Sequence, residues 1–113
     1  MIIMKLQPEY FYKIKAGTKT FEIRLNDEKR QAIKIGDNII FKNDANPLEG
    51  VIVKVVDLKH FNSFLEMARI LSLESIGCEN MNAEKVDRLY HKFYSKTDEK
   101  TYGVLAIKIQ LVK

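Results

Sequence analysis

The alternation of apolar and polar positions predicts five strands in this chain. It is cleanest over 103–112, where four aliphatic residues share one face: Leu105, Ile107, Ile109 and Leu111. The same period of two runs through 20–25, and the short apolar segments 1–6 and 38–42 are also predicted strands. The segment 49–58 carries apolar residues on both faces, so we expect both sides of that strand to be at least partly covered.

A spacing of three and four residues predicts three helices. The first opens at Pro8 and ends at Gly17, residues typical of a helix start and stop. The second covers 61–71, with Ser63 and Glu66 as a capping box. The third follows Asn82 as its N-cap and places one apolar stripe: Val86, Leu89, Tyr90 and Phe93. Loops or turns are predicted at 26–33 (with room for one helical turn), 43–47, 72–80 and 96–100.

The order of these elements favours an α+β fold. No predicted helix separates the middle strands, which argues against a doubly wound parallel sheet. A mostly antiparallel, curled sheet with helices packed at its side fits the order better. The length suits a single domain spanning 1–113, and no internal repeat or low-complexity segment interrupts it.

Composition narrows the function classes only slightly. The net charge is +4 and the pI about 9.1, which leans towards nucleic acid, but 15 acidic residues are interspersed with the 19 basic ones. The single Cys78 excludes an internal disulfide, and the two distant histidines give no zinc-site spacing. With no Walker loop or dinucleotide fingerprint either, we expect no metal and no cofactor.

The N-terminal apolar run is too short for a signal peptide or a membrane span. We therefore expect a cytoplasmic protein without membrane association. The sequence leaves its oligomeric state open.

Candidate chemistry gathers at the start of the strand 20–25. Glu22 and Arg24 share its polar face, so a carboxylate lies beside a guanidinium, and Lys19 stands at the strand entrance. Such a cluster suits an anionic or hydrogen-bonding ligand. From these residues alone, a surface ion pair worth about 0–1 kcal/mol is the simpler interpretation.

The stretch from Gly17 to Arg24 fits G-x-K-x-x-E-x-R and resembles the signature of the ASCH domain family, part of the PUA-like superfamily. Three further segments, 8–14, 35–41 (with G-D-x-I-x-F) and 102–107, are similar to other family segments, so the resemblance spans most of the chain. It implies a small PUA-like β-barrel with helices at its side.

The resemblance also implies a function for the signature. Lys19, Glu22 and Arg24 would line a cleft between barrel and helices that binds RNA or a nucleotide-like ligand. Lys19 would contact a phosphate or carbonyl, and Arg24 would offer a planar fork to a phosphate or base edge. Glu22 would orient one of these cations or accept from an amino group. An RNA- or nucleotide-binding module is therefore the leading hypothesis.

A second hypothesis comes from a branch of the superfamily that resembles amidohydrolases removing the acetyl group of N4-acetylcytidine. Their catalytic set is a Lys, a Thr three residues later, and a Glu in an E-N-M stretch. Lys19 and Glu79 match the Lys and the Glu, but Glu22 stands at the Thr position. A carboxylate there is a poor nucleophile substitute and would keep Lys19 protonated. The alternative interpretation of Glu79 is an exposed loop carboxylate near a helix N-terminus, where the helix dipole favours a negative charge.

Two other classes stay open: a ribonuclease, for which no base is assigned, and a partner-binding domain with no small ligand.

Tyrosines and basic residues supply the predicted rim of the cleft. Tyr94 and Tyr102 are candidates for stacking on bases, whereas Tyr90 is assigned to the core. We interpret His91 as a solvent-facing helical residue without a catalytic role. Four residues would make one edge of the last helix basic and let it follow a phosphate backbone: Lys85, Arg88, Lys92 and Lys96. An ordinary solvated helix face explains them equally well.

Overall fold

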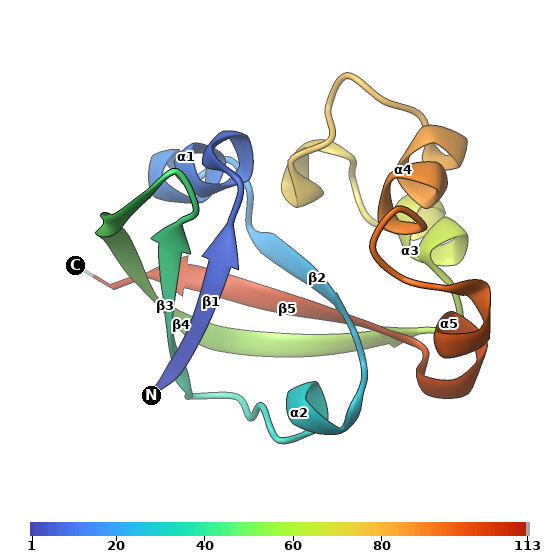
Figure 1. The fold of residues 1–113 in the computed structure, drawn as a ribbon, viewed down its shortest axis with the longest axis horizontal. Helices are drawn as coiled ribbons and strands as arrows, with labels where there is room; N and C mark the ends of the chain where they lie inside the picture. Colours follow the sequence, from blue (N-terminus) through green and yellow to red (C-terminus); the bar gives the residue numbers. More distant parts are fainter. Residues whose placement is uncertain (113) are drawn as a thin grey trace.

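Five strands form one curled sheet in the computed structural model, which describes residues 1–112. The strand order is β1 (Ile2–Leu6), β3 (Asn38–Asn43), β4 (Asn46–Phe61), β5 (Val104–Leu111) and β2 (Phe21–Leu25). β1 pairs with β3 in parallel, and the other three pairings are antiparallel. This half-barrel, with helices packed on it, confirms the predicted α+β class (Figure 1).

The longest strand, β4, is the one around which the sheet curls. Its first part pairs with β3 and its second part with β5, and the two pairings overlap at Val53 and Lys54. The register with β5 shifts between Val55 and Asp57, and such a bulge increases local twist and bending. The edge strands β1 and β2 are thereby both brought to the front of the view in Figure 1.

Two hydrophobic cores lie on opposite faces of β5. Leu105 and Ile107 face the barrel core, together with Phe11 and Ile14 of α1 (Pro8–Ala16). The intervening Ala106 belongs instead to a second core under the C-terminal helices. The alternation predicted for this strand is therefore present, and helices cover its second face as well.

Helix starts and stops follow the predicted capping residues. α1 begins at Pro8 and ends at Gly17, which adopts a left-handed φ of 85°. α3 (Phe64–Ile70) begins after Ser63, whose side chain accepts from the Glu66 N–H. α4 (Ala83–Tyr90) begins after Asn82, whose side chain accepts from the Lys85 N–H. These caps are local, which is why sequence alone located them.

Several element boundaries differ from the predictions. The predicted 43–47 loop is only a turn at 44–45, because the Asn43 side chain accepts from the Ala45 N–H and lets β4 start at Asn46. Phe61 does not begin a helix; it ends β4 and pairs with Val104. The helical turn expected within 26–33 is present as α2 (Glu28–Gln31), whereas the predicted 72–80 loop also holds a turn, η1 (Glu74–Ile76).

The C-terminal part of the predicted helical region is also wrong in two places. α4 ends at Tyr90, so Phe93 leaves the apolar stripe and is 62% exposed. The segment 96–100 is not a turn but lies in α5 (Lys96–Tyr102), whose N-cap Ser95 accepts from the Asp98 N–H. Across the described residues, none of the helices combines the length and hydropathy needed to cross a membrane.

We expect Gly77→Ala to destabilise the fold more than Gly17→Ala. Both glycines have positive φ, 81° and 85°, which costs an alanine about 1–2 kcal/mol. A Cβ at Gly77 would also lie 3.0 Å from Cδ of Lys19 and 3.1 Å from Cδ1 of Tyr10, whereas a Cβ at Gly17 meets nothing within 4 Å. Crowding should add roughly 1–3 kcal/mol at Gly77. Urea unfolding of both variants measures the difference, and equal losses would contradict it.

Candidate functional site

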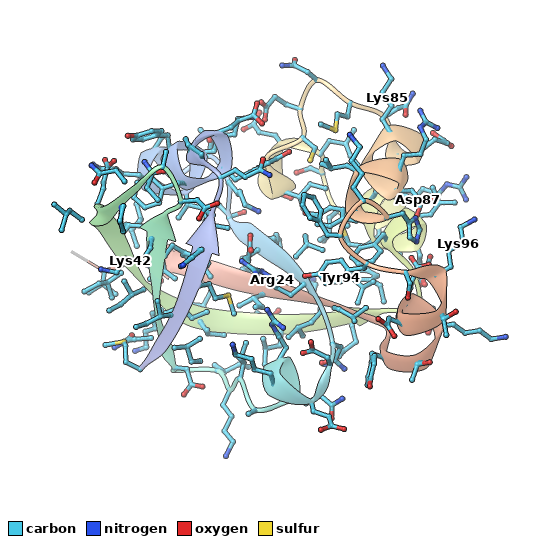
Figure 2. All side chains as sticks on the ribbon, viewed as in Figure 1. Arg24, Lys42, Lys85, Asp87, Tyr94 and Lys96 are labelled. Carbon is cyan, nitrogen blue, oxygen red and sulfur yellow. The ribbon has the colours of Figure 1, made fainter. Side chains whose placement is uncertain are left out.

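A cavity of about 300 Å³ lies where β2 faces α1 and the end of α4. Its floor carries the charged residues of the β2 segment, and its opposite wall is aromatic. The residues that the next paragraphs use are Lys5, Lys19, Glu22, Arg24, Tyr90, Phe93 and Tyr94. In Figure 2 the labelled side chains of Arg24 and Tyr94 lie close together at the centre of the view.

The Lys19 ammonium is fully enclosed. Its side chain is 1% exposed, and Nζ donates to the carbonyl of Phe21 and to the carbonyl of Ile76 at 3.3 Å, and forms an ion pair with Oε1 of Glu22 at 3.2 Å. An ammonium has three N–H donors and no acceptor. Two of these donors are bonded to backbone carbonyls, and the charge of the ammonium is paired with Glu22.

Glu22 joins two cations through its two carboxylate oxygens. Oε1 pairs with Lys19, and Oε2 accepts from Nε of Arg24 at 2.6 Å. Burial by itself would raise the pKa of Glu22, but the charges of Lys19 and Arg24 and their hydrogen bonds outweigh it and lower that pKa. Glu22 is therefore an ionised, buried anchor.

Arg24 is held along one edge of its guanidinium. Nε donates to Glu22, and Nη2 donates to the backbone carbonyl of Lys5 on β1 at 3.1 Å. Burial by itself would lower the pKa of Arg24, but the charge and hydrogen bond of the Glu22 carboxylate outweigh it and raise that pKa. The guanidinium therefore stays charged. Nη1 makes no hydrogen bond to the described residues, which leaves this donor for a ligand in the cavity that Arg24 lines.

The aromatic wall is fixed from behind by Phe64. This fully buried ring stacks on Tyr90 at 4.8 Å between centroids and 3° between planes, and on Tyr94 at 5.5 Å and 15°. Burial raises the pKa of Tyr90 well above 10, so its hydroxyl is neutral at physiological pH. The exposed Phe93 extends the wall outwards.

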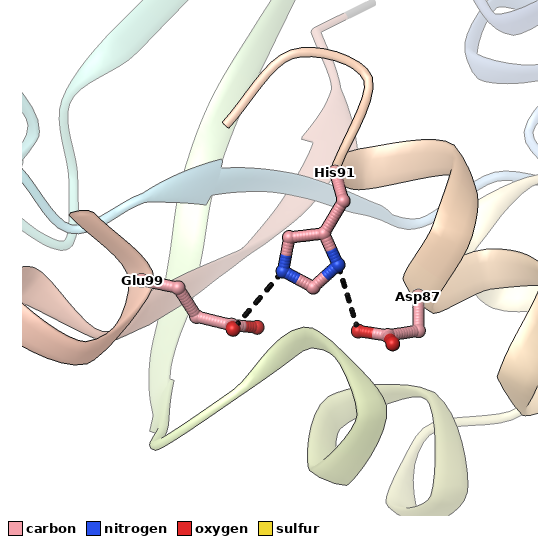
Figure 3. A group of neighbouring side chains, drawn as sticks. All are labelled: Asp87, His91 and Glu99. Atoms are coloured by element: carbon pink, nitrogen blue, oxygen red, sulfur yellow. Dashed lines mark hydrogen bonds and ion pairs between the residues drawn. The ribbon is translucent and has the colours of Figure 1, made fainter. Parts of the chain in front are cut away.

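His91 is not the solvent-facing residue that we predicted. Its side chain is 17% exposed, and its ring lies between Asp87, 3.3 Å from Nδ1, and Glu99, 3.0 Å from Nε2 (Figure 3). Glu99 also accepts from the backbone N–H of Phe64 at 2.8 Å. This network ties α4, α5 and the start of α3 together, and it sits directly beside Tyr90.

The same three side chains place their ligand atoms within 4.8 Å of one another, the spacing of a metal site. However, each of the two carboxylates pairs with a different nitrogen of the His91 ring (Figure 3). A metal bonds only one of these nitrogens, so the arrangement suits a paired imidazole better than a metal centre.

The other predicted site residues lie apart from this cavity. Glu79 pairs with Lys13 at 2.7 Å, and neither residue lines the cavity. Tyr102 lines a different hollow near Asn26. Arg88 and Lys92 are exposed and also lie outside the cavity lining.

Sequence reasoning missed several parts of the cavity wall, among them the segment 5–7, Tyr10, Asp44 and Phe93. The first two reach it only through the folding of β1 and α1 against β2. For Phe93, the signal available in the sequence was an aromatic residue close to the end of the predicted helix.

We expect Glu22→Gln to lower the free energy of unfolding at pH 7 by about 3–5 kcal/mol, the range for removing one partner of a buried ion pair. The pKa of Glu22 is lower in the folded protein than its ordinary value of 4.5. Its contribution is therefore present above pH 4.5 and is lost as the pH falls through the lowered folded value. Urea unfolding from pH 7 to pH 3 should show the gap between wild type and variant narrowing.

Glu84→Gln is the matched control. Glu84 pairs with Arg69 at 3.4 Å, but both side chains are more than half exposed, so little change is expected. A Glu22→Gln loss as small as that of the control, or independent of pH, would contradict the buried-anchor interpretation.

Solved structures resemble this fold along almost its whole length. The hypothetical protein PH0355 is 40% identical over 97% of both chains, with a TM-score of 0.86. PF0455 from Pyrococcus furiosus is 35% identical over 99% of this chain and 97% of its own, with a TM-score of 0.69. An ASCH protein from Zymomonas mobilis shares the fold at 15% identity and a TM-score of 0.61, over 96% of this chain and 65% of its own.

None of the curated proteins compared with the chain matches it. The family model of the ASCH domain, in contrast, matches residues 4–113, which contain the whole G-x-K-x-x-E-x-R stretch. With that match over nearly the full length, the chain belongs to the ASCH domain family.

Proposed function

We propose that this ASCH domain binds RNA or a nucleotide-like ligand by taking a base into the cavity between β2 and α4. One observation carries the proposal: a guanidinium with a free edge, Arg24, lines the same cavity as the stacked Tyr90 and Tyr94 rings. A nucleobase offers a flat face for aromatic stacking and a polar edge for hydrogen bonds. The cavity provides a counterpart for each.

The charged residues have distinct roles in this proposal. Arg24 donates from Nη1 to a base edge or a phosphate oxygen. Glu22 is a positioning residue, because it holds the guanidinium by Nε. Lys19 is a positioning residue for Glu22, since its buried ammonium pairs with that carboxylate and donates to two backbone carbonyls. Tyr94 and the exposed Phe93 supply stacking surface.

Hydrolysis of an N4-acylated cytidine has less support from the same geometry. Its nucleophile position is occupied by Glu22, which is ionised and paired with two cations. Lys19 is paired with Glu22 and donates to two backbone carbonyls, and Glu79 is paired with Lys13. A ribonuclease likewise lacks an assignable base among these side chains.

We expect Arg24→Gln and Phe93→Ala each to weaken binding of a fluorescein-labelled, mixed-sequence RNA octamer by about ten-fold. The first removes the free donor, and the second removes exposed stacking surface, an effect of about 1–3 kcal/mol per base. Fluorescence anisotropy at low salt measures both. Because Phe93 is exposed, its variant also tests the cavity if Arg24→Gln proves unstable.

Arg69→Gln and Ile70→Ala are the matched controls, since these side chains are exposed and lie outside the cavity. Wild-type protein that binds neither the octamer nor cytidine monophosphate would overturn the proposal, as would site variants that bind like wild type. Incubation with N4-acetylcytidine adds a second arm: release of cytidine that depends on Lys19 would favour the amidohydrolase instead.

A further inference from the structure

The half-barrel has an open seam between its two edge strands. In the described part of the chain, β1 and β2 do not pair with each other. The Arg24 side chain bridges them instead, by donating from Nη2 to the Lys5 carbonyl. Figure 1 shows both strands at the front of the sheet, with α2 below them.

A second cavity, of about 670 Å³, follows this seam from the N-terminal part of β1 to α2. We call this the seam cavity, and the cavity between β2 and α4 the base cavity. Lys5 and Arg24 line both of them. The two cavities therefore adjoin on either side of the bridging guanidinium. A ligand that reaches both cavities has to cross Arg24.

The seam cavity is predominantly basic. Lys5, Arg24, Lys29 and Arg30 line it, against one carboxylate, Asp37, which already accepts from the Lys34 N–H. Lys5 and Lys29 are exposed and form no ion pair with the described residues. Two free ammonium groups beside a guanidinium suit a phosphodiester backbone.

Arg30 adds an unsatisfied donor at the same place. Its Nη1 pairs with Asp27 at 2.9 Å, but its buried Nε has no hydrogen-bond partner among residues 1–112. Leaving a buried donor unpaired is costly, so the Arg30 side chain, which lines the seam cavity, lacks one of its possible hydrogen bonds within the described residues.

We propose that the seam cavity is the phosphate subsite of this site, so that its ligand is a single-stranded polynucleotide rather than a free nucleoside. The inference rests on the proposed function. One base occupies the first cavity, and the strand then crosses Arg24 so that the next phosphates meet Lys29 and Arg30. An added peptide strand would also use the free edge of β1, but the excess of basic side chains favours phosphates.

The test is the salt dependence of RNA-octamer binding by the double variant Lys29→Gln with Arg30→Gln. Each phosphate contact on a single strand contributes about 0.7 to the slope of log affinity against log salt. Loss of two contacts should lower that slope by roughly 1.4 and weaken binding about ten-fold at about 0.1 M salt. Lys29→Gln alone should give about half the change in slope, and it does not disturb the Arg30–Asp27 pair.

The matched control is Lys85→Gln with Lys96→Gln, which removes the same charge from exposed positions on α4 and α5 (Figure 2). We expect its slope to equal that of the wild type. If the control lowers the slope and the seam variant does not, the backbone follows α4 and the inference is wrong. If Phe93→Ala weakens octamer binding while the seam variants change nothing, the base cavity stands and the seam inference fails, leaving the edge of β1 for a peptide strand.

Discussion

The buried chain of charges Lys19–Glu22–Arg24 is the constraint on which the site depends. Removing an ion from water costs several kcal/mol, so each of these groups needs close partners. Glu22 alone has too few lone pairs within reach to satisfy both cations fully, and backbone carbonyls complete the set. Because the Ile76 carbonyl is one of them, the end of η1 must lie against β2. Gly77 follows at once, where only a residue without a side chain leaves room for Lys19.

The same buried ion pairs also fix the orientation of the Arg24 guanidinium. An arginine on a surface strand samples many rotamers and loses that freedom when it binds. Here Glu22 and the Lys5 carbonyl already fix two of its nitrogens, so little further ordering is needed for Nη1 to donate. The aromatic wall is ordered in a comparable way by Phe64 and by the Asp87–His91–Glu99 network. Phe93 lies outside these contacts and is exposed.

Local signals located most of the framework, and long-range contacts account for what they missed. Pro8, Ser63 and Asn82 cap helices by bonds within a few residues, and β5 alternates because one face always meets the barrel. α5 lacks an apolar stripe, and contacts of Glu99 with His91 and with the Phe64 N–H help to hold it. The full engagement of Lys19 was equally hidden, since Ile76 is 57 residues away. The Lys19–Glu22 pair itself was predictable, because the signature brings the two groups to one place.

The open seam gives these buried charges a consequence beyond one cavity. A closed barrel would pair β1 with β2 and leave no free edge, whereas here one guanidinium spans the gap. An exposed edge strand invites pairing with another chain, and lysine side chains along such an edge discourage it. Lys5 on β1, with Lys29 and Arg30 opposite, therefore opposes a peptide strand, and the same basic side chains suit the phosphates of the proposed ligand. Since Glu22 holds Arg24 by Nε, the buried anchor of the first cavity also orients the one side chain that donates across the seam to the Lys5 carbonyl.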